Sequence, residues 1–165
     1  MAKNSFEIRL AGEQDWAEIW QMFHSVVSAG DAYVYDPQTT QEQAKTIWFN
    51  STQVYVAICD GKVLGSYIIK PNFPGLGSHV ANCSYMVSED ARGMGLGRLL
   101  GEHSIVVAKD SGYQSMQFNI VVSTNAAAVK LWQALGFTII GTSPKAFRHK
   151  TLGLVDTYIM HREID

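Results

Sequence analysis

A glycine-rich segment, residues 92–98 (RGMGLGR), joins a strand-like stretch to a helix-like one. Its glycines lack Cβ atoms at alternate positions where the backbone turns, so the N–H groups of the first helical turn can converge on a bound group. Such N–H donors favour an anion, most naturally a phosphate. Arg92 and Arg98 add positive charge at both ends. The segment therefore predicts a phosphate-binding turn.

Three other phosphate-binding loops are excluded by spacing. A Walker loop requires Gly-Lys-Ser/Thr, whereas Gly97 is followed by Arg98 and Leu99. A Rossmann fingerprint beginning at Gly95 would place its third glycine at Leu100. A kinase loop needs a catalytic-loop motif downstream, which the sequence does not contain. The alternative that remains is a merely flexible turn.

Two helices are predicted in the first part of the chain. An alternating strand at residues 6–10 precedes a helix at about 15–28, whose apolar side chains fall on one face. A second helix is expected at about 40–49. The expected capping boxes are Asp15 with Glu18 and Thr39 with Glu42.

A hairpin and a long loop follow these helices. Strands at 53–59 and 63–70 are joined by an Asp-Gly turn signal. Pro71 cannot donate to a sheet ladder, so it is expected to end the hairpin and to open a loop at 71–81. This loop and the one at 29–37 are the segments expected to choose an acceptor.

Strands and helices alternate in the rest of the chain. Two helical stripes begin near Leu96 and Ala128 and are expected to end at Gly112 and Gly136. Hairpin strands come first and crossover helices later, which indicates an α/β or α+β fold with one mixed sheet and helices on both faces. No linker or repeat interrupts residues 1–165, so one domain is expected. The remaining strands are predicted at 82–88, 116–122, 138–142 and 154–164.

Two motifs resemble the GCN5-related N-acetyltransferases, the GNAT family. Its acetyl-CoA signature, Arg/Gln-x-x-Gly-x-Gly/Ala, is matched by residues 92–97 at the strand-to-helix turn. A second block, in which Asn precedes small residues, an aromatic and Gly-Phe, is matched by residues 125–137. The resemblance implies the GNAT fold, a mostly antiparallel sheet, and transfer of an acetyl group from acetyl-CoA directly to an amine without an enzyme nucleophile.

The resemblance also implies how acetyl-CoA is held. Its pyrophosphate is expected on the amides of residues 93–98, and its pantetheine is expected to pair with the backbone groups of Tyr85, Met86 and Val87. An N–H near Val87 is expected to polarise the thioester carbonyl. Many members of the family use a tyrosine to protonate the leaving thiolate at the position where this chain has Trp132. An indole N–H is no practical acid, and Trp132 can also be interpreted as a packing residue. Asn125, a predicted helix cap, is then the nearer group for the leaving thiolate. The residues assigned to acetyl-CoA are Tyr85, Met86, Val87, Arg92, Gly93, Met94, Gly95, Leu96, Gly97, Arg98 and Asn125.

A narrower resemblance is to fungal acetyltransferases that act on proline analogues such as azetidine-2-carboxylate. It rests on residues 70–73 (KPNF), on Phe118-Asn119 six positions before Thr124-Asn125, and on Trp132. It implies that Asn72 and Asn119 hold the acceptor's amine and carboxylate. The residues assigned to the acceptor are Asn72, Phe73 and Asn119, with Asn119 and Asn125 as the catalytic side chains.

The alternation in the strand at 116–122 supports this role for Asn119. Met116, Phe118, Ile120 and Val122 make one apolar face, which directs Asn119 to the other. A polar side chain there needs a partner, which can equally be a neighbouring loop.

No general base is singled out by the sequence. The basic stretch at 145–150 is expected to be a solvated loop, with contact to the CoA 3′-phosphate or to an acidic acceptor as the alternative. No spacing of His, Cys, Asp or Glu indicates a metal site. The candidate bases, each also explicable as a structural residue, are Glu89, Asp90, His79, His103 and His149.

The composition limits the partners. Thirteen Lys and Arg against fifteen Asp and Glu give a net charge of −2, so neither nucleic acid nor anionic lipid is expected. The longest apolar run, residues 54–59, is far shorter than the roughly 20 residues of a membrane span, and a charged N-terminus argues against export. Cys59 and Cys83 are expected to be buried free thiols in a reducing cytoplasm.

These observations predict a cytoplasmic, acetyl-CoA-dependent N-acetyltransferase of a small amine, an amino acid or an analogue of one. The alternatives are a protein or peptide N-acetyltransferase and a non-catalytic module that binds acyl-CoA. The family resemblance also implies a homodimer, for which the sequence shows no interface.

Overall fold

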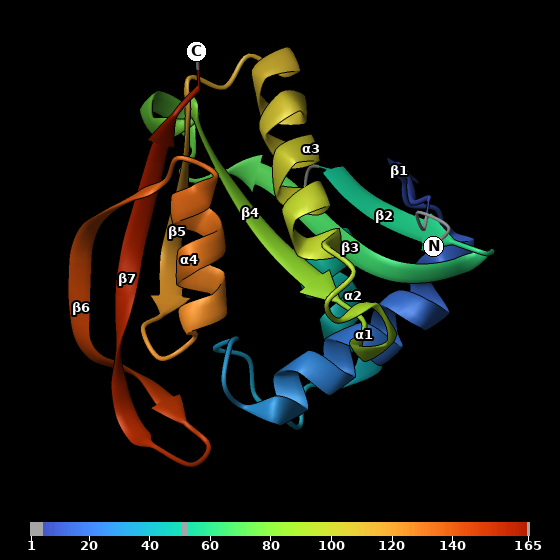
Figure 1. The fold of residues 1–165 in the computed structure, drawn as a ribbon, viewed down its shortest axis with the longest axis horizontal. Helices are drawn as coiled ribbons and strands as arrows, with labels where there is room; N and C mark the ends of the chain where they lie inside the picture. The colour runs from blue at the N-terminus through green and yellow to red at the C-terminus, as the bar shows by residue number, and fades with distance from the viewer. Residues whose placement is uncertain (1–4, 51–52, 165) are drawn as a thin grey trace.

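The computed structural model describes residues 5–50 and 53–164, which build one seven-stranded sheet with helices on both faces (Figure 1). The sheet is mixed and mostly antiparallel, as the order of elements predicted. The elements are β1 (Glu7–Leu10), α1 (Trp16–Ala29), α2 (Gln41–Phe49), β2 (Gln53–Cys59), β3 (Lys62–Pro71), β4 (Val80–Val87), α3 (Leu96–Asp110), β5 (Ser115–Val122), α4 (Ala126–Ala134), β6 (Thr138–His149) and β7 (Gly153–Glu163), with short 3-10 turns at Glu13–Asp15, Gly75–Gly77 and Glu89–Ala91.

The strands lie in the order β1, β2, β3, β4, β5, β7, β6, and only β4 and β5 are parallel neighbours. Helices α1 and α2 cover one face of the sheet, and α3 and α4 cover the other (Figure 1). The central strand β3 is buried on both sides: Tyr67 and Ile69 pack on the side of α3 and α4, and Ile68 packs on the side of α1 and α2. Each face therefore has its own apolar core.

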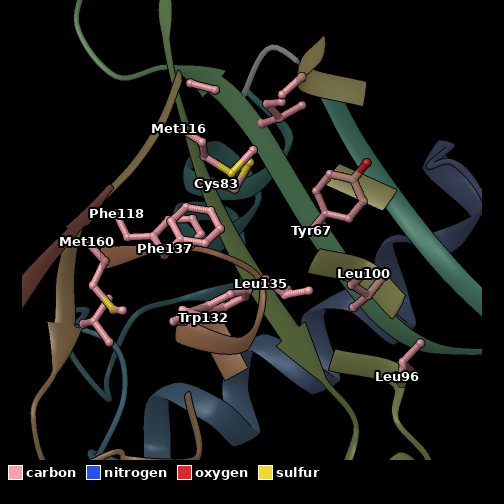
Figure 2. Packing of buried hydrophobic residues seen from close by; sticks show 14 of the residues in the cluster. Tyr67, Cys83, Leu96, Leu100, Met116, Phe118, Trp132, Leu135, Phe137 and Met160 are labelled. Atoms are coloured by element: carbon pink, nitrogen blue, oxygen red, sulfur yellow. The ribbon is translucent and has the colours of Figure 1, made fainter. Parts of the chain in front are cut away.

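Aromatic side chains fix α4 against β5. The rings of Phe118 and Phe137 stack with centroids 4.5 Å apart, and Trp132 of α4 lies 4.7 Å from Phe118 (Figure 2). Leu135 is buried in the same cluster. These contacts hold the C-terminal part of α4 against the sheet.

The parallel strands β4 and β5 separate soon after they meet. Their pairing covers only Val80 with Ser115 and Ala81 with Met116, and β4 then runs away from β5 (Figure 1). At the point of separation the Asn82 side-chain amide donates to the backbone carbonyl of Gln117 at 2.9 Å. Both strands consequently have an edge that no neighbouring strand covers.

The two predicted capping boxes are wrong in detail. Asp15 precedes α1, but its buried carboxylate accepts hydrogen bonds of 2.7 and 2.8 Å from Arg9 and of 2.7 Å from the Gly12 N–H. The bond from Arg9 lowers the pKa of Asp15. The box of α2 lies one residue later than predicted and consists of Thr40 and Gln43.

Two predictions near the C-terminal half are also wrong. The alternation of β5 is broken by a register shift between Phe118 and Val121, so Ile120 is 47% exposed and Val121 is buried. Residues 145–149 of the basic stretch belong to β6, where Phe147 is buried, and are not a loop. In both places a bulge in the pairing changes which side chains face the core.

Cys59 and Cys83 are buried free thiols, as predicted. None of the helices described here has the length and hydrophobicity needed to cross a membrane.

Candidate functional site

The glycine turn lies between β4 and α3, where the sequence placed it. Gly93 and Gly95 have φ values of 75° and 76°, which L side chains rarely adopt, and a Cβ added at either would have no heavy atom within 4 Å. Gly97 lies inside α3, and a Cβ there would be 3.5 Å from Leu131 of α4. The N–H groups in the first turn of α3 have no intrahelical acceptors. Open space beside these donors fits a phosphate group.

Arg92 and Arg98 flank the turn in exposed ion pairs. Arg92 lies 3.3 Å from Glu89, and Arg98 lies 2.8 Å from Glu102. Ion pairs at such exposed positions contribute little free energy. Either guanidinium group can therefore exchange its carboxylate for an incoming phosphate at small cost.

A cleft of about 470 Å³ opens between the separating strands β4 and β5. A larger and more open hollow of about 810 Å³, beside Gly136 and Arg162, contains none of the predicted site residues. The cleft is lined by Val26, Ala32, Tyr33, Val34, Tyr35, Lys70, Asn82, Cys83, Ser84, Tyr85, Met86, Val87, Phe118, Asn119, Ile120, Val121, Val122, Asn125, Ala128 and Trp132.

The edge of β4 presents alternate backbone groups to this cleft. The Tyr85 N–H donates to the Tyr33 hydroxyl at 2.8 Å, and that hydroxyl donates to the Tyr85 carbonyl at 2.6 Å. Because backbone groups alternate along a strand, Val87 also faces the cleft, whereas Met86, paired with Ser66, faces β3. Of the three residues assigned to pantetheine, two therefore offer backbone groups to the cleft.

The structure brings together Asn72 and Asn119, which lie 47 residues apart in sequence. The Asn119 amide donates to the Asn72 side-chain oxygen at 2.7 Å, and Gln117 donates to the Asn119 oxygen at 3.0 Å. Asn119 lines the cleft, and Phe73, next to Asn72, is 59% exposed. The partner of Asn119 is thus a residue of a neighbouring loop. This hydrogen bond is compatible with a structural role for Asn119 as well as with a role in binding.

Asn125 and Trp132 both line the cleft but differ in what they can donate. The Asn125 oxygen caps α4 by accepting from the Ala128 N–H at 3.2 Å, which leaves its NH₂ group to donate. Trp132 is 9% exposed, and its ring lies 4.7 Å from those of Tyr85 and Phe118. The contacts of Trp132 are those of a packing residue.

None of the five candidate bases is among the residues that line the cleft, and the lining within the described part of the chain includes no Asp, Glu or His. His103 lies 2.8 Å from the Tyr67 hydroxyl, and burial lowers the pKa of His103. His149 accepts from backbone N–H groups in its own hairpin. Glu89 pairs with Arg92. Within the described ranges no three His, Cys, Asp or Glu side chains form a metal-binding group.

Lys150, the last residue of the basic stretch, does not line the cleft but holds the start of a loop that does. Its N–H donates to the Gly30 carbonyl at 2.9 Å, and its ammonium donates to the Ser28 carbonyl at 3.2 Å. Lys150 therefore fixes the end of α1, directly before the loop that carries Tyr33 and Tyr35.

Sequence reasoning missed individual residues that line the cleft. Tyr33, Tyr35, Lys70 and Asn82 were assigned no role, although the loop at 29–37 was expected to matter and does line the cleft. The two tyrosines in this loop were the signal that could have identified it, because large aromatic side chains are usually buried against a neighbouring surface. The loop at 71–81 contributes through Asn72.

Comparison with known proteins agrees with the motifs. The family model described as Acetyltransferase (GNAT) family matches residues 14–137. A solved GCN5-related N-acetyltransferase from Kribbella flavida superimposes with a TM-score of 0.94 at 46% identity, covering 98% of this chain and 99% of that one.

Two curated relatives are similar over most of the sequence. N-acetyltransferase aca1 of Schizosaccharomyces pombe is 33% identical over 81% of this chain and 72% of its own length. L-amino acid N-acyltransferase MnaT of Escherichia coli is 32% identical over 84% of this chain and 83% of its own length.

Proposed function

Because the chain belongs to the acetyltransferase (GNAT) family and is an N-acetyltransferase, we propose that it transfers the acetyl group of acetyl-CoA to the amine of a small carboxylate-bearing acceptor, an amino acid or an analogue of one. The observation that carries the proposal is the cleft between β4 and β5, which has an open strand edge as its wall and lies directly before the glycine turn.

The chain's backbone fits acetyl-CoA along this path. The turn at Gly93 and Gly95 has room and N–H donors for the pyrophosphate. The groups of Tyr85 and Val87 that face the cleft can pair with the amides of pantetheine. An N–H on this edge can donate to the thioester carbonyl oxygen as negative charge develops on it.

The reaction needs no covalent intermediate on the enzyme. The acceptor nitrogen forms a bond to the thioester carbon, the carbon–sulfur bond breaks, and the sulfur leaves as a thiolate that takes a proton. The Asn125 NH₂ group is available to donate a hydrogen bond to that sulfur. With no acid or histidine among the described lining residues, the ammonium proton leaves through ordered water.

The charge of the cleft supports a carboxylate on the acceptor. Lys70 is the one lysine or arginine among the described residues that line it, and no acidic side chain accompanies Lys70 there. Lys70 lies opposite Asn82 in the β3–β4 register, near the Asn72–Asn119 pair. A positive charge beside amide groups suits a carboxylate. The similarity to MnaT, an L-amino acid N-acyltransferase, favours the same acceptor class.

A single assay tests the proposal against its two rivals. The purified protein is mixed with acetyl-CoA and with matched acceptors, namely free amino acids, their amides and peptides, and free thiol is followed. Thiol release with free amino acids and much less with their amides is expected. Release with peptides alone would indicate a peptide acetyltransferase, and acetyl-CoA binding without release from any acceptor would indicate a non-catalytic module.

A further inference from the structure

Tyr33 links the loop after α1 to β4 through one hydroxyl group. That hydroxyl accepts from the Tyr85 N–H at 2.8 Å and donates to the carbonyl of the same residue at 2.6 Å. Burial raises the pKa of Tyr33, so the hydroxyl keeps the proton that it donates at neutral pH. Tyr33 and Tyr85 lie 52 residues apart in sequence, so this contact is made by the fold and not by a local turn.

The two groups that Tyr33 engages are those of an unpaired strand edge. β4 has β5 as a neighbour only at Val80 and Ala81, and beyond them the N–H and C=O groups facing the cleft need other partners. An extended ligand that adds to this edge would pair with the same N–H and C=O. Such a ligand cannot pair with the Tyr85 N–H and C=O while Tyr33 stays in place, because the Tyr33 hydroxyl already forms short hydrogen bonds with both groups on that side of the strand.

We propose that Tyr33 occupies the acetyl-CoA position on β4, that it must leave Tyr85 for acetyl-CoA to bind, and that its release reshapes the acceptor end of the cleft. The inference rests on the proposed function, since it takes acetyl-CoA as the ligand of the β4 edge. Tyr33, Val34 and Tyr35 all line the cleft, so movement of one alters the space left for the acceptor.

The loop is built so that it can move while its start stays fixed. Gly30 ends α1 with φ 67°, and Lys150 holds the Gly30 and Ser28 carbonyls. Within the described residues, the hydrogen bonds of segment 31–35 are those of Tyr33 to Tyr85. Its other ties are aromatic: Tyr33 stacks on Tyr35 at 6.0 Å, and Tyr35 lies 5.6 Å from Phe23. Release of Tyr33 therefore requires the loss of two hydrogen bonds and a shift of these aromatic contacts.

Calorimetric titration of acetyl-CoA into Tyr33→Phe tests the competition. Removing the hydroxyl frees the Tyr85 groups without removing the ring, so the variant is expected to bind acetyl-CoA three- to tenfold more tightly than wild type, and tenfold corresponds to about 1.4 kcal/mol. Tyr113→Phe is the matched control, because it also removes a tyrosine hydroxyl, at a position outside the residues that line the cleft. Its Kd is expected to stay within twofold of wild type.

Weaker binding by Tyr33→Phe would make the hydroxyl a ligand of acetyl-CoA, and an unchanged Kd would mean that it does not compete; either result overturns the inference. A wild-type protein that does not bind acetyl-CoA would overturn the proposed function itself.

A rapid-mixing measurement on wild type avoids any effect of substitution on folding. If Tyr33 must first leave, the observed rate of acetyl-CoA binding should level off at high ligand concentration, because opening becomes limiting. A rate that stays linear in acetyl-CoA up to the fastest measurable step would overturn the inference. With saturating acetyl-CoA, acceptor binding should become detectable where acceptor alone does not bind.

Discussion

The two ends of the cleft between β4 and β5 are built from different parts of the chain. At the C-terminal end of β4, the turn offers backbone N–H groups and empty space beside Gly93 and Gly95. Toward the point where the strands separate, Asn72 of the loop after β3 and Asn119 of β5 are hydrogen-bonded, and Lys70 of β3 lines the same cleft.

Because one end offers backbone groups and the other offers side chains, the two ends can recognise different chemical groups. Backbone donors at a helix N-terminus bind a phosphate whatever the neighbouring side chains are. Amide and ammonium groups from distant segments select one arrangement of charge and hydrogen-bond partners. Changes at the turn should therefore alter acetyl-CoA binding, and changes near Lys70 and Asn119 should alter the acceptor alone.

Gly95→Val is expected to give the largest effect. A valine at φ 76° is strained, and its side chain enters the space that the pyrophosphate needs, so acetyl-CoA should bind at least tenfold more weakly, about 1.4 kcal/mol. Gly153→Val is the matched control, since Gly153 has φ 78° and equally open surroundings in the β6–β7 hairpin. Calorimetric titration should show the loss for Gly95→Val only; an unchanged Kd would place the phosphate elsewhere.

Lys70→Ala should lower kcat/KM for carboxylate-bearing acceptors about tenfold, because an ammonium–carboxylate pair is lost from a partly enclosed cleft. The uncharged amides of the same acceptors should be affected much less, and the Kd for acetyl-CoA should not change. Lys62→Ala, at the far end of the same strand, serves as the control. Equal losses for acids and amides would remove Lys70 from acceptor recognition.

Asn119→Ala should raise the acceptor KM or lower kcat by about three- to fivefold, the effect of one neutral hydrogen bond of about 1 kcal/mol, and leave acetyl-CoA binding intact. Because Asn119 donates to Asn72, the double variant with Asn72→Ala should lose less than the product of the single effects. Steady-state kinetics on all three variants measures this coupling. Survival of both kinetic constants would make Asn119 a structural residue.

His103→Gln should give the smallest effect, on stability and not on the reaction. Burial lowers the pKa of His103 in the folded protein, so below about pH 6.5 the unfolded chain takes up the proton more readily and stability falls. In thermal unfolding, the Tm of wild type should fall more between about pH 7 and about pH 5 than the Tm of the variant, which lacks the histidine. A changed pH profile of kcat/KM would instead bring His103 into the chemistry.

The sequence predicted the glycine turn beside the cleft because the signals of such a turn are local. Glycines at alternate positions require neither a partner nor a register, and Gly93 and Gly95 have the positive φ values that make glycine necessary. The order of strands and helices was likewise evident from periodicity and turn residues. The predicted helix caps were less accurate. The cap of α2 lies one residue later than predicted, and the Asp15 carboxylate binds Arg9 and the Gly12 N–H instead of the N–H groups of α1.

The end of the cleft near Asn119 could be predicted only in part, because it depends on pairing between distant segments. The bulge in β5 that exposes Ile120 follows from its register with β7, which no local pattern contains. The contact of Tyr33 with Tyr85 spans 52 residues, and a loop tyrosine alone does not indicate which strand it meets. Asn72 and Asn119 were paired through resemblance to a family and not through their spacing.

The two residue pairs that join β4 to β5 also make the sheet a structure in two parts. Strands β1 to β4 and strands β5 to β7 share few backbone hydrogen bonds, so amide hydrogen exchange should show two sets of protected groups with separate opening free energies. A ligand lying along the β4 edge would act as an additional strand. Exchange at Val87 should then slow on binding, and the resistance of the whole sheet to opening would depend on the ligand concentration.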